Sequence, residues 1–376
     1  MSGLRKDVIA VIQPFVPGYR RPLFDAIDAE LRLRGLRLEV WHDSPKGRVA
    51  ARGNAASGEW SVPIRQRRVS LGRRNITYRG VLGEARRVRA VVAGLASTNI
   101  ETYALALDPH VRLMLWGHGR NFTASNNTID TRIEAWLARR SAHVLTYTDE
   151  GKSHVVAQGA PDDKVTVVVN ATDTRRLRAE RAAVTPQESE ELRAAHGLKG
   201  RRVALFVGAF DEPKQLPFLF HAMDQVTAVH DDVTLVLAGA GPEASEVEQF
   251  VAARHYAQVV GRLEASELAR FSTITDLLVM PGRVGLVAVD ALGLGLPIVT
   301  TRYPWHAPEA AYLTDGVDSV WTEFEVTAYA EGVTELLGDA ARLQSLRAGA
   351  EHSGASFSVE SSAARFVAGI LAGLES

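Results

Sequence analysis

Runs of consecutive apolar residues, many of them β-branched, recur along the first half of the chain and alternate with stretches of helical periodicity. A continuous apolar run is typical of a strand buried on both faces of a parallel sheet. A helix is predicted to begin near Pro22, because proline suits a first turn, and another to span residues 129–140. Strands are predicted at residues 8–12, 36–41, 88–93, 111–116, 144–147 and 165–169. This alternation predicts an α/β fold built on a doubly wound parallel sheet.

The pattern restarts after a polar stretch at residues 174–200, which contains Pro186 and reads as an inter-domain connection plus a helix. Residues 203–207 and 233–238 are predicted strands, the second followed by a glycine-rich turn, and alternation continues to about residue 350. Residues 359–374 are predicted to form an amphipathic helix. Two Rossmann-like domains are therefore expected, over residues 1–180 and 181–358, with ligands at the carboxyl ends of the strands and in a cleft between the domains.

Composition and charge narrow the protein class. The 376 residues are 46% hydrophobic and 23% charged, which fits a globular protein. No apolar run is expected to be long enough to span a membrane, and no signal peptide is expected, so a cytoplasmic location is predicted. The absence of cysteine excludes disulfides and cysteine nucleophiles. The net charge of −1 conceals +11 over residues 1–180 and −12 over the remainder, which favours different partners for the two halves.

The segment MPGRVGLVAVDALGLGLPIVTT, residues 280–301, holds the most informative candidate site. It reads as strand, loop, helix and strand. The backbone amides of Gly285, Leu286 and Val287 lie near the predicted helix N-terminus, where amides favour an anion such as a diphosphate. Asp290 follows one turn later, within reach of a ligand hydroxyl. The alternative reading is an ordinary βαβ unit with a polar helix residue.

The order GLVxxxxA followed by GLPIV resembles the nucleotide-sugar site of retaining GT-B glycosyltransferases of the family 4-like type. Three further stretches resemble that family in the same order: FVGAFDEPKQL, VVGRLEASELARFSTITDLLVMP and WHAPEAAYLTDGVDSV. VVNATDTRRL, with Asn170 and Asp173, resembles the turn that closes its first domain, and residues 359–376 resemble the helix that crosses back to that domain. The resemblance implies a GT-B fold and sugar transfer from a nucleotide-diphosphate donor with retained anomeric configuration.

The resemblance also implies roles for individual residues of the second half. Lys214 matches the phosphate-binding lysine and Gly208 the strand end beneath the donor phosphates. Arg262 matches the stretch that frames the base. Glu309 matches a recurrent acid, and Asp290 matches the acid that holds the ribose. For Lys214 the alternative is a solvated loop lysine.

Two positions depart from the family pattern. Gly282 stands where the family has the first of two glutamates, and Ala209 stands where it usually has arginine. The role of the first acid is vacant or is taken by Arg283 or Glu309. The departures keep two readings open: a donor sugar with fewer hydroxyls, or a pseudo-glycosyltransferase that binds nucleotide sugar without normal transfer.

Two residues of the first half are candidates for the acceptor and donor-sugar side. His118, in LWGHGRN, follows a predicted strand between two glycines, and the resemblance implies that it orients the acceptor or the sugar. Gly18 would let the backbone approach the phosphates. The alternatives are a structural histidine and a simple turn glycine.

Arginine is concentrated in residues 65–89, which hold nine arginines and one acid, Glu84. Few aromatic residues lie nearby, so nucleic acid is not an expected partner. Arg67, Arg68, Arg73 and Arg74 are candidates for contact with an anionic membrane leaflet or a phosphate-bearing acceptor. The alternative is a solvated basic face.

The resemblance implies a retaining transferase, and the lack of metal-ligand spacing in the sequence predicts that it needs neither a metal nor a cofactor. Its partners are a nucleotide-diphosphate sugar and a glycan, glycolipid or small-molecule acceptor. Its expected place is the cytoplasm, with peripheral contact at the inner leaflet. A third hypothesis is a non-catalytic anion-binding protein at a membrane surface.

Overall fold

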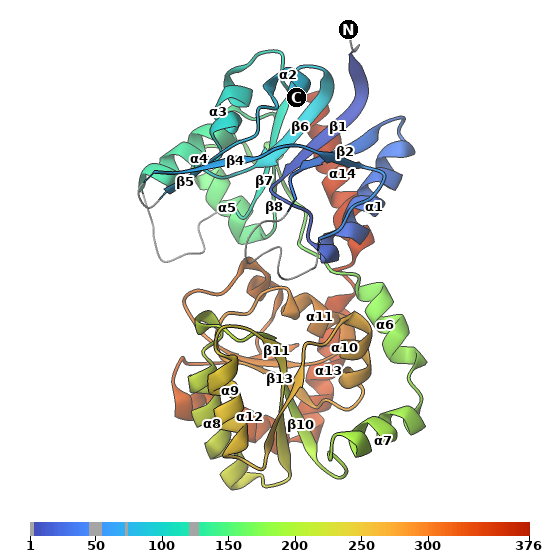
Figure 1. Cartoon of the computed structure of the whole chain (residues 1–376), viewed down its shortest axis with the longest axis vertical. Coiled ribbons are helices and arrows are strands. Elements are labelled where there is room, and N and C mark those ends of the chain that lie inside the picture. The colour runs from blue at the N-terminus through green and yellow to red at the C-terminus, as the bar shows by residue number, and fades with distance from the viewer. Residues whose placement is uncertain (1–3, 45–54, 72–73, 120–127) are drawn as a thin grey trace. The chain divides into compact units, whose positions relative to one another are not determined.

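The computed structural model describes residues 4–44, 55–71, 74–119 and 128–376, which form two compact units (Figure 1). Unit 1 comprises Met1–Thr172 and Val359–Ser376, and unit 2 comprises Asp173–Ser358. The boundary lies earlier than residue 180, where the sequence placed it. The reason is that helix α6 (Thr174–Ala183) packs in unit 2, where Arg178 donates to the carbonyl oxygen of Gly293 at 3.0 Å.

Unit 1 is built on a seven-stranded parallel sheet of order β3-β2-β1-β6-β7-β8-β9. Its strands are β1 (Arg5–Gln13), β2 (Arg37–His42), β3 (Ser61–Pro63), β6 (Val88–Gly94), β7 (Leu113–Gly117), β8 (His143–Thr146) and β9 (Val165–Val167). Its helices are α1 (Arg21–Arg32), α2 (Leu82–Ala85), α3 (Ile100–Leu107), α4 (Thr128–Arg140), α5 (Asp149–Ala157) and α14 (Val359–Glu375), with short 3-10 turns at Gly18–Arg20 and Asp162–Lys164. The six predicted strands of this half are confirmed.

Alternate residues of β1 enter two separate cores. Ile9 and Val11 pack with apolar residues of α1 and α14, whereas Val8 and Ala10 pack on the other face of the sheet. The continuous apolar run therefore has the expected cause, because both faces are covered. Figure 1 shows α14 (red) beside α1 (blue).

The stretch Ala340–Glu375 is apolar enough for a membrane span by length and composition, with an 18-residue window of mean hydropathy 1.2 that is 44% buried. The expectation that no apolar stretch is long enough to span a membrane is therefore wrong as far as composition alone is considered. The stretch consists of two helices, α13 (Ala340–Gly354) and α14. Phe366 and Ile370 of α14 are fully buried in unit 1, so we read α14 as a core helix.

The arginine-rich segment forms an antiparallel hairpin that the hydrophobic pattern does not predict. Strand β4 (Arg67–Leu71) pairs with β5 (Arg74–Tyr78) and stands apart from the main sheet. Strands β4 (RRVSL) and β5 (RNITY) lack the apolar run of a buried strand, because each begins with arginine and mixes polar with apolar side chains.

Unit 2 repeats the architecture with a six-stranded parallel sheet of order β12-β11-β10-β13-β14-β15. Its strands are β10 (Arg202–Ala209), β11 (Val233–Ala240), β12 (Ala257–Gly261), β13 (Leu277–Met280), β14 (Ile298–Thr301) and β15 (Ser319–Thr322). Its helices are α6, α7 (Pro186–Ala195), α8 (Leu216–Val229), α9 (Ala244–Ala252), α10 (Ala265–Ser272), α11 (Val287–Leu294), α12 (Val326–Gly338) and α13, with 3-10 turns η4 (Glu212–Lys214) and η5 (Pro308–Tyr312). Residues 174–200 thus form two helices of unit 2 rather than a connection with one helix.

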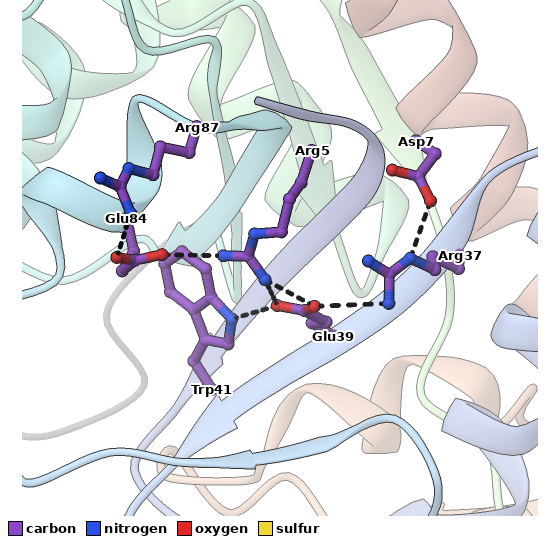
Figure 2. A network of polar contacts seen from close by, with 7 residues as sticks. All are labelled: Arg5, Asp7, Arg37, Glu39, Trp41, Glu84 and Arg87. Atoms are coloured by element: carbon purple, nitrogen blue, oxygen red, sulfur yellow. Dashed lines mark hydrogen bonds and ion pairs between the residues drawn. The ribbon is translucent and has the colours of Figure 1, made fainter. Parts of the chain in front are cut away.

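A network of ion pairs and hydrogen bonds surrounds Arg5 at the start of β1 in unit 1 (Figure 2). Arg5 donates to both carboxylate oxygens of Glu39, at 2.7 and 2.8 Å, and to Glu84 at 3.0 Å. Glu39 is buried and also accepts from the indole of Trp41 at 3.0 Å. Each charge in this network faces an opposite charge, as expected of a structural ion-pair cluster.

Candidate functional site

In unit 2, two loops at the carboxyl ends of adjacent strands β10 and β13 are joined by close backbone contact. The Arg283 amide donates to the Pro213 carbonyl oxygen at 2.8 Å. A Cβ atom on Gly282 would lie 2.5 Å from that oxygen and 2.5 Å from the carbonyl carbon of Lys214. A side chain at position 282 therefore has no room. The missing glutamate is explained by the approach of the two loops.

Lys214 is the cation at this junction. Its Nζ donates to the Arg283 carbonyl oxygen at 2.6 Å, and its side chain lies over Gly208, whose Cβ would be 3.1 Å from the lysine Cε. Burial lowers the pKa of Lys214 to about 8, and the positive charge of Arg283 adds to this, whereas Asp211 and Glu309 oppose it. Among the described residues no carboxylate forms an ion pair with Lys214.

Helix α11 begins beside this lysine. Leu286 is its N-cap residue, and no side chain caps the first turn. A Cβ atom on Gly285 would lie 3.9 Å from Oε2 of Glu309, which is only 4% exposed. Asp290 stands in the first turn of α11. The structure thus brings together Gly208, Lys214, Gly282, Arg283, Gly285 and Glu309, with Leu286, Val287 and Asp290 on the adjoining helix start.

Arg262 is not brought to this junction by any contact that the structure describes. It is exposed beyond β12, an edge strand that β11 separates from β10.

Several residues that sequence reasoning missed position the loop of residues 281–286. His306 Nδ1 accepts from the Val284 amide at 3.0 Å, and its Nε2 lies 2.8 Å from the Thr301 carbonyl oxygen. Burial lowers the pKa of His306, as do the charges of Lys214 and Arg283, so the ring is neutral with its proton on Nε2. Thr300 and Thr301 donate to the carbonyl oxygens of Met280 and Pro281, at 2.8 and 2.7 Å. The threonine pair after GLPIV is the available sequence signal.

In unit 1, a cavity of about 530 Å³ lies at the carboxyl ends of the neighbouring strands β1, β6 and β7. Arg20 lines it and donates to Gln13 Oε1 at 3.0 Å, to the Tyr147 hydroxyl at 2.8 Å and to the Tyr19 hydroxyl at 3.2 Å. Its guanidinium carbon lies 4.6 Å from the ring centre of Trp116. Burial works against the charged form, but the oxygens of Tyr147 and Tyr19 outweigh it and raise the pKa of Arg20.

His118 lines the same cavity, with its ring centre 4.9 Å from that of Tyr147. Packing explains why glycine follows His118. Gly119 has φ +76°, and a Cβ atom there would lie 2.5 Å from the Gly151 carbonyl oxygen. The loop is therefore clamped to the start of α5. Gly18 opens the 3-10 turn that leads into Tyr19 and Arg20.

The arginines of residues 65–89 do not form one basic surface, because some of them pair with carboxylates. Arg79 is buried and pairs with Glu101 at 2.7 Å, Arg86 pairs with Asp108 at 2.7 Å, and Arg87 pairs with Glu84 at 3.2 Å. Arg67 and Arg68 are exposed on β4, and Arg68 lines the cavity. Arg73 lies outside the described residues, as does the side chain of Arg74. Among the described parts of the chain, no group of three or more His, Asp or Glu side chains could hold a metal ion.

One family model and several curated proteins are similar to parts of this chain. Residues 201–339 match the family model described as glycosyl transferases group 1. A 2-deoxystreptamine glucosyltransferase of Streptomyces kanamyceticus is 29% identical over 177 residues, 45% of this chain and 44% of the relative. An alpha-D-kanosaminyltransferase of the same organism is 22% identical over 229 residues, 57% of this chain and 58% of the relative. The chain spans about half the length of these curated relatives.

Solved structures share the fold over almost the whole chain. Anabaena Alr3699/HepE in complex with UDP has a TM-score of 0.66 at 15% identity, covering 97% of this chain and 99% of that one. A glycosyltransferase from Rickettsia africae has a TM-score of 0.70 at 14% identity, covering 96% and 97%. These likenesses confirm the expected GT-B fold of two Rossmann-like sheets, and residues 201–339 are similar in sequence to glycosyl transferases group 1.

Proposed function

We propose that the protein transfers a sugar from a nucleotide-diphosphate donor to an acceptor hydroxyl, with retention at the anomeric carbon and without a metal ion. The observation that carries the proposal is the junction of Lys214, the Gly282–Arg283 backbone and the start of α11, within the segment that matches the family model. A lysine ammonium beside first-turn amides is a site for a diphosphate. The complexes of Anabaena Alr3699/HepE with UDP and with UDP-glucose support this choice of donor.

In this proposal the acceptor hydroxyl oxygen bonds to the anomeric carbon as the bond from that carbon to the diphosphate oxygen breaks. The departing diphosphate takes the electron pair of the broken bond and accepts the hydroxyl proton. Lys214 and the amides of α11 stabilise the charge that develops on the leaving diphosphate. The protein acts mainly by positioning reactants and by stabilising that charge.

Two further residues of unit 2, Asp290 and Glu309, complete the proposed donor site. Asp290 holds the ribose. Glu309, buried beside Gly285, takes the place of the acid that is missing at Gly282. His118, in the cavity of unit 1, orients the acceptor or the sugar, and it remains a prediction that His118→Ala lowers transfer by roughly 10²–10⁴-fold.

The pseudo-glycosyltransferase alternative rested on Gly282 and Ala209. The backbone approach at Gly282 gives this glycine a packing reason. A cytoplasmic location remains a prediction, as does contact of the arginine-rich hairpin with an anionic membrane.

The test is to screen nucleoside diphosphates and their sugars by thermal shift, then to incubate the protein with the stabilising donor and candidate acceptors in EDTA. Release of nucleoside diphosphate with an α-linked product from an α-linked donor supports the proposal. Stabilisation without turnover on any acceptor favours the alternative, and no stabilisation by any nucleotide contradicts both.

Calorimetry with the free nucleoside diphosphate tests the role of Asp290. Asp290→Ala is expected to lose about 1.5–3 kcal/mol of binding free energy, because one charged hydrogen bond to the ribose is removed. Asp231→Ala, at an exposed position before β11, is the matched control and should bind like the wild type. Equal affinity of both variants would contradict the assignment.

A further inference from the structure

The cavity of unit 1 has the size of a small-molecule site. Its volume of about 530 Å³ lies within the range of ligand pockets, roughly 300–1,000 Å³. It opens where β1, β6 and β7 end, which is the edge of a parallel sheet where ligands bind.

The charged side chains that line this cavity are mostly cations. Arg20, Arg68 and Arg79 face one carboxylate, Glu101. That carboxylate is already engaged, since Glu101 accepts from the Arg79 guanidinium at 2.7 Å and from the Arg79 amide at 3.0 Å. The lining therefore has an excess of positive charge.

Among the described residues, Arg20 is held only by neutral groups. It contacts the Gln13 amide oxygen, two tyrosine hydroxyls and the Trp116 ring, and no carboxylate of the described chain pairs with it. Withdrawing a cation from water without a counter-charge is unfavourable. These neutral contacts instead fix the planar guanidinium in one orientation, where it can meet a carboxylate or phosphate through two hydrogen bonds.

The unpaired polar atoms of the cavity wall are donors. Nε of Arg79 and Nε1 of Trp116 are buried and have no hydrogen-bond partner among the described residues. Both residues line the cavity, and the Arg79 side chain is only 5% exposed. Both atoms are enclosed, so they add to the excess of donors around the cavity rather than meeting a ligand directly.

We propose that this cavity takes an acceptor that carries an anionic group, carboxylate or phosphate, and that Arg20 binds that group. The inference rests on the proposed function only in calling the ligand an acceptor. The site excludes acceptors whose charge is positive, because the cavity presents arginine where an ammonium group would need a carboxylate.

The test uses three probes that share one sugar scaffold and differ in charge: methyl glucuronide, methyl glucoside and methyl glucosaminide. Glucose 6-phosphate is added to separate phosphate from carboxylate. Binding to the wild-type protein is measured by calorimetry or ligand-observed NMR at low salt, without donor. Arg20→Gln replaces the charged guanidinium with a neutral amide that can still donate hydrogen bonds. Arg20→Lys restores the charge without the planar guanidinium group. Arg34→Gln, which breaks an exposed pair with Glu30, is the matched control.

The wild-type protein and Arg34→Gln are expected to bind at least one acidic probe about 10- to 100-fold more tightly than the neutral glucoside, and the glucosaminide more weakly still. Arg20→Gln should lose this preference while its affinity for the glucoside is unchanged, and Arg20→Lys should recover part of it. Preference for the glucuronide would identify the bound group as a carboxylate, and preference for glucose 6-phosphate would identify it as a phosphate.

Three results would overturn the inference: equal binding of acidic and neutral probes, tighter binding of the glucosaminide, or binding of no probe at all. A loss of nucleoside diphosphate affinity in Arg20→Gln without any acid preference would also overturn it, because Arg20 would then serve the donor. Failure of the proposed function is distinguishable, since it would show as absent nucleotide binding in a protein that still prefers the acids.

Discussion

An arginine lies near each end of strand β1, and the two arginines differ in the groups that surround them. Arg5, the first residue of β1, pairs with Glu39 and Glu84 in the network of Figure 2. Arg20, which follows the other end of the strand, is held by an amide oxygen, two hydroxyls and an indole ring. Lys214 repeats the second pattern in unit 2, where its Nζ donates to a backbone carbonyl oxygen.

This contrast separates a stabilising cation from a binding one. A cation with its own carboxylate is neutralised and contributes to folding. A cation oriented by neutral groups keeps its charge for a ligand, and the protein is less stable than it would be with a paired one. The amino ends of the strands then serve stability and the carboxyl ends serve function, as in other doubly wound sheets.

The largest expected effect comes from removing the binding cation of unit 2. Lys214→Ala should lower the rate of transfer by about 10²–10³-fold, because charge on the leaving diphosphate is no longer offset. Lys199→Ala, at an exposed position of the same unit, should be unaffected. Full turnover by Lys214→Ala would contradict the role of Lys214 in binding. So would a thermal midpoint far below that of Lys199→Ala, because Lys214 would then serve stability like a core residue.

The next effect concerns a stabilising cation. Glu39→Gln should destabilise unit 1 by about 2–3 kcal/mol, because it leaves the half-buried Arg5 without its main counter-charge. Glu30→Gln breaks only an exposed pair with Arg34 and should change stability by less than about 1 kcal/mol. Urea unfolding of both variants measures the difference, and equal midpoints would show that the network is not structural.

The pH dependence of donor binding sharpens the comparison. The pKa of Lys214 is lowered to about 8, so the free protein loses this positive charge as the pH rises through 8. Affinity for a nucleoside diphosphate, whose phosphates are fully ionised in this range, should fall above pH 8 by up to roughly tenfold per unit. Lys214→Arg stays charged and should give a flat profile. Parallel profiles for the two proteins would assign the titration to another group.

The half-buried acid Glu134 offers the smallest test. Burial raises the pKa of Glu134 to about 7, and the charge of Asp130 adds to this, whereas a hydrogen bond from the Ser97 backbone opposes it. The folded state therefore holds more protons than the unfolded state between pH 4.5 and 7, so its stability falls as the pH rises through this window. Glu134→Gln should raise stability at pH 8 by on the order of 1 kcal/mol and leave it unchanged at pH 4. A gain of equal size at both pH values would contradict the shifted pKa.

The sequence predicted what local pattern determines. Most strands of both sheets were visible as apolar runs, though β3, β12 and β15 were not, and Lys214, Gly285 and Asp290 were visible through motif order. Contacts between distant segments were not visible. Glu101 and Asp108 neutralise arginines more than twenty positions away in sequence, so the basic span looked like one free surface. The need for glycine at position 282 depends on the backbone at Pro213, and no local pattern marks it.

Arg20 was missed for a related reason. In the sequence it is one arginine in PFVPGYRRP, and only the fold shows that its neighbours are neutral. The hairpin of β4 and β5 was missed because its strands are short and mix arginine with polar residues, so hydrophobic periodicity gives no signal.

The most direct test of the contrast removes one charge at a time with the same substitution. Arg5→Gln, Arg20→Gln and Lys214→Gln are each measured for thermal midpoint and for affinity toward a nucleoside diphosphate and the acidic sugar probes. Arg5→Gln should lose several degrees in midpoint and keep both affinities. Lys214→Gln should keep its midpoint and lose the diphosphate, and Arg20→Gln should keep its midpoint and lose the acid preference. If Arg5→Gln changed ligand affinity, or if the other two variants lost only stability, the partners of a cation would not reveal its role in this protein.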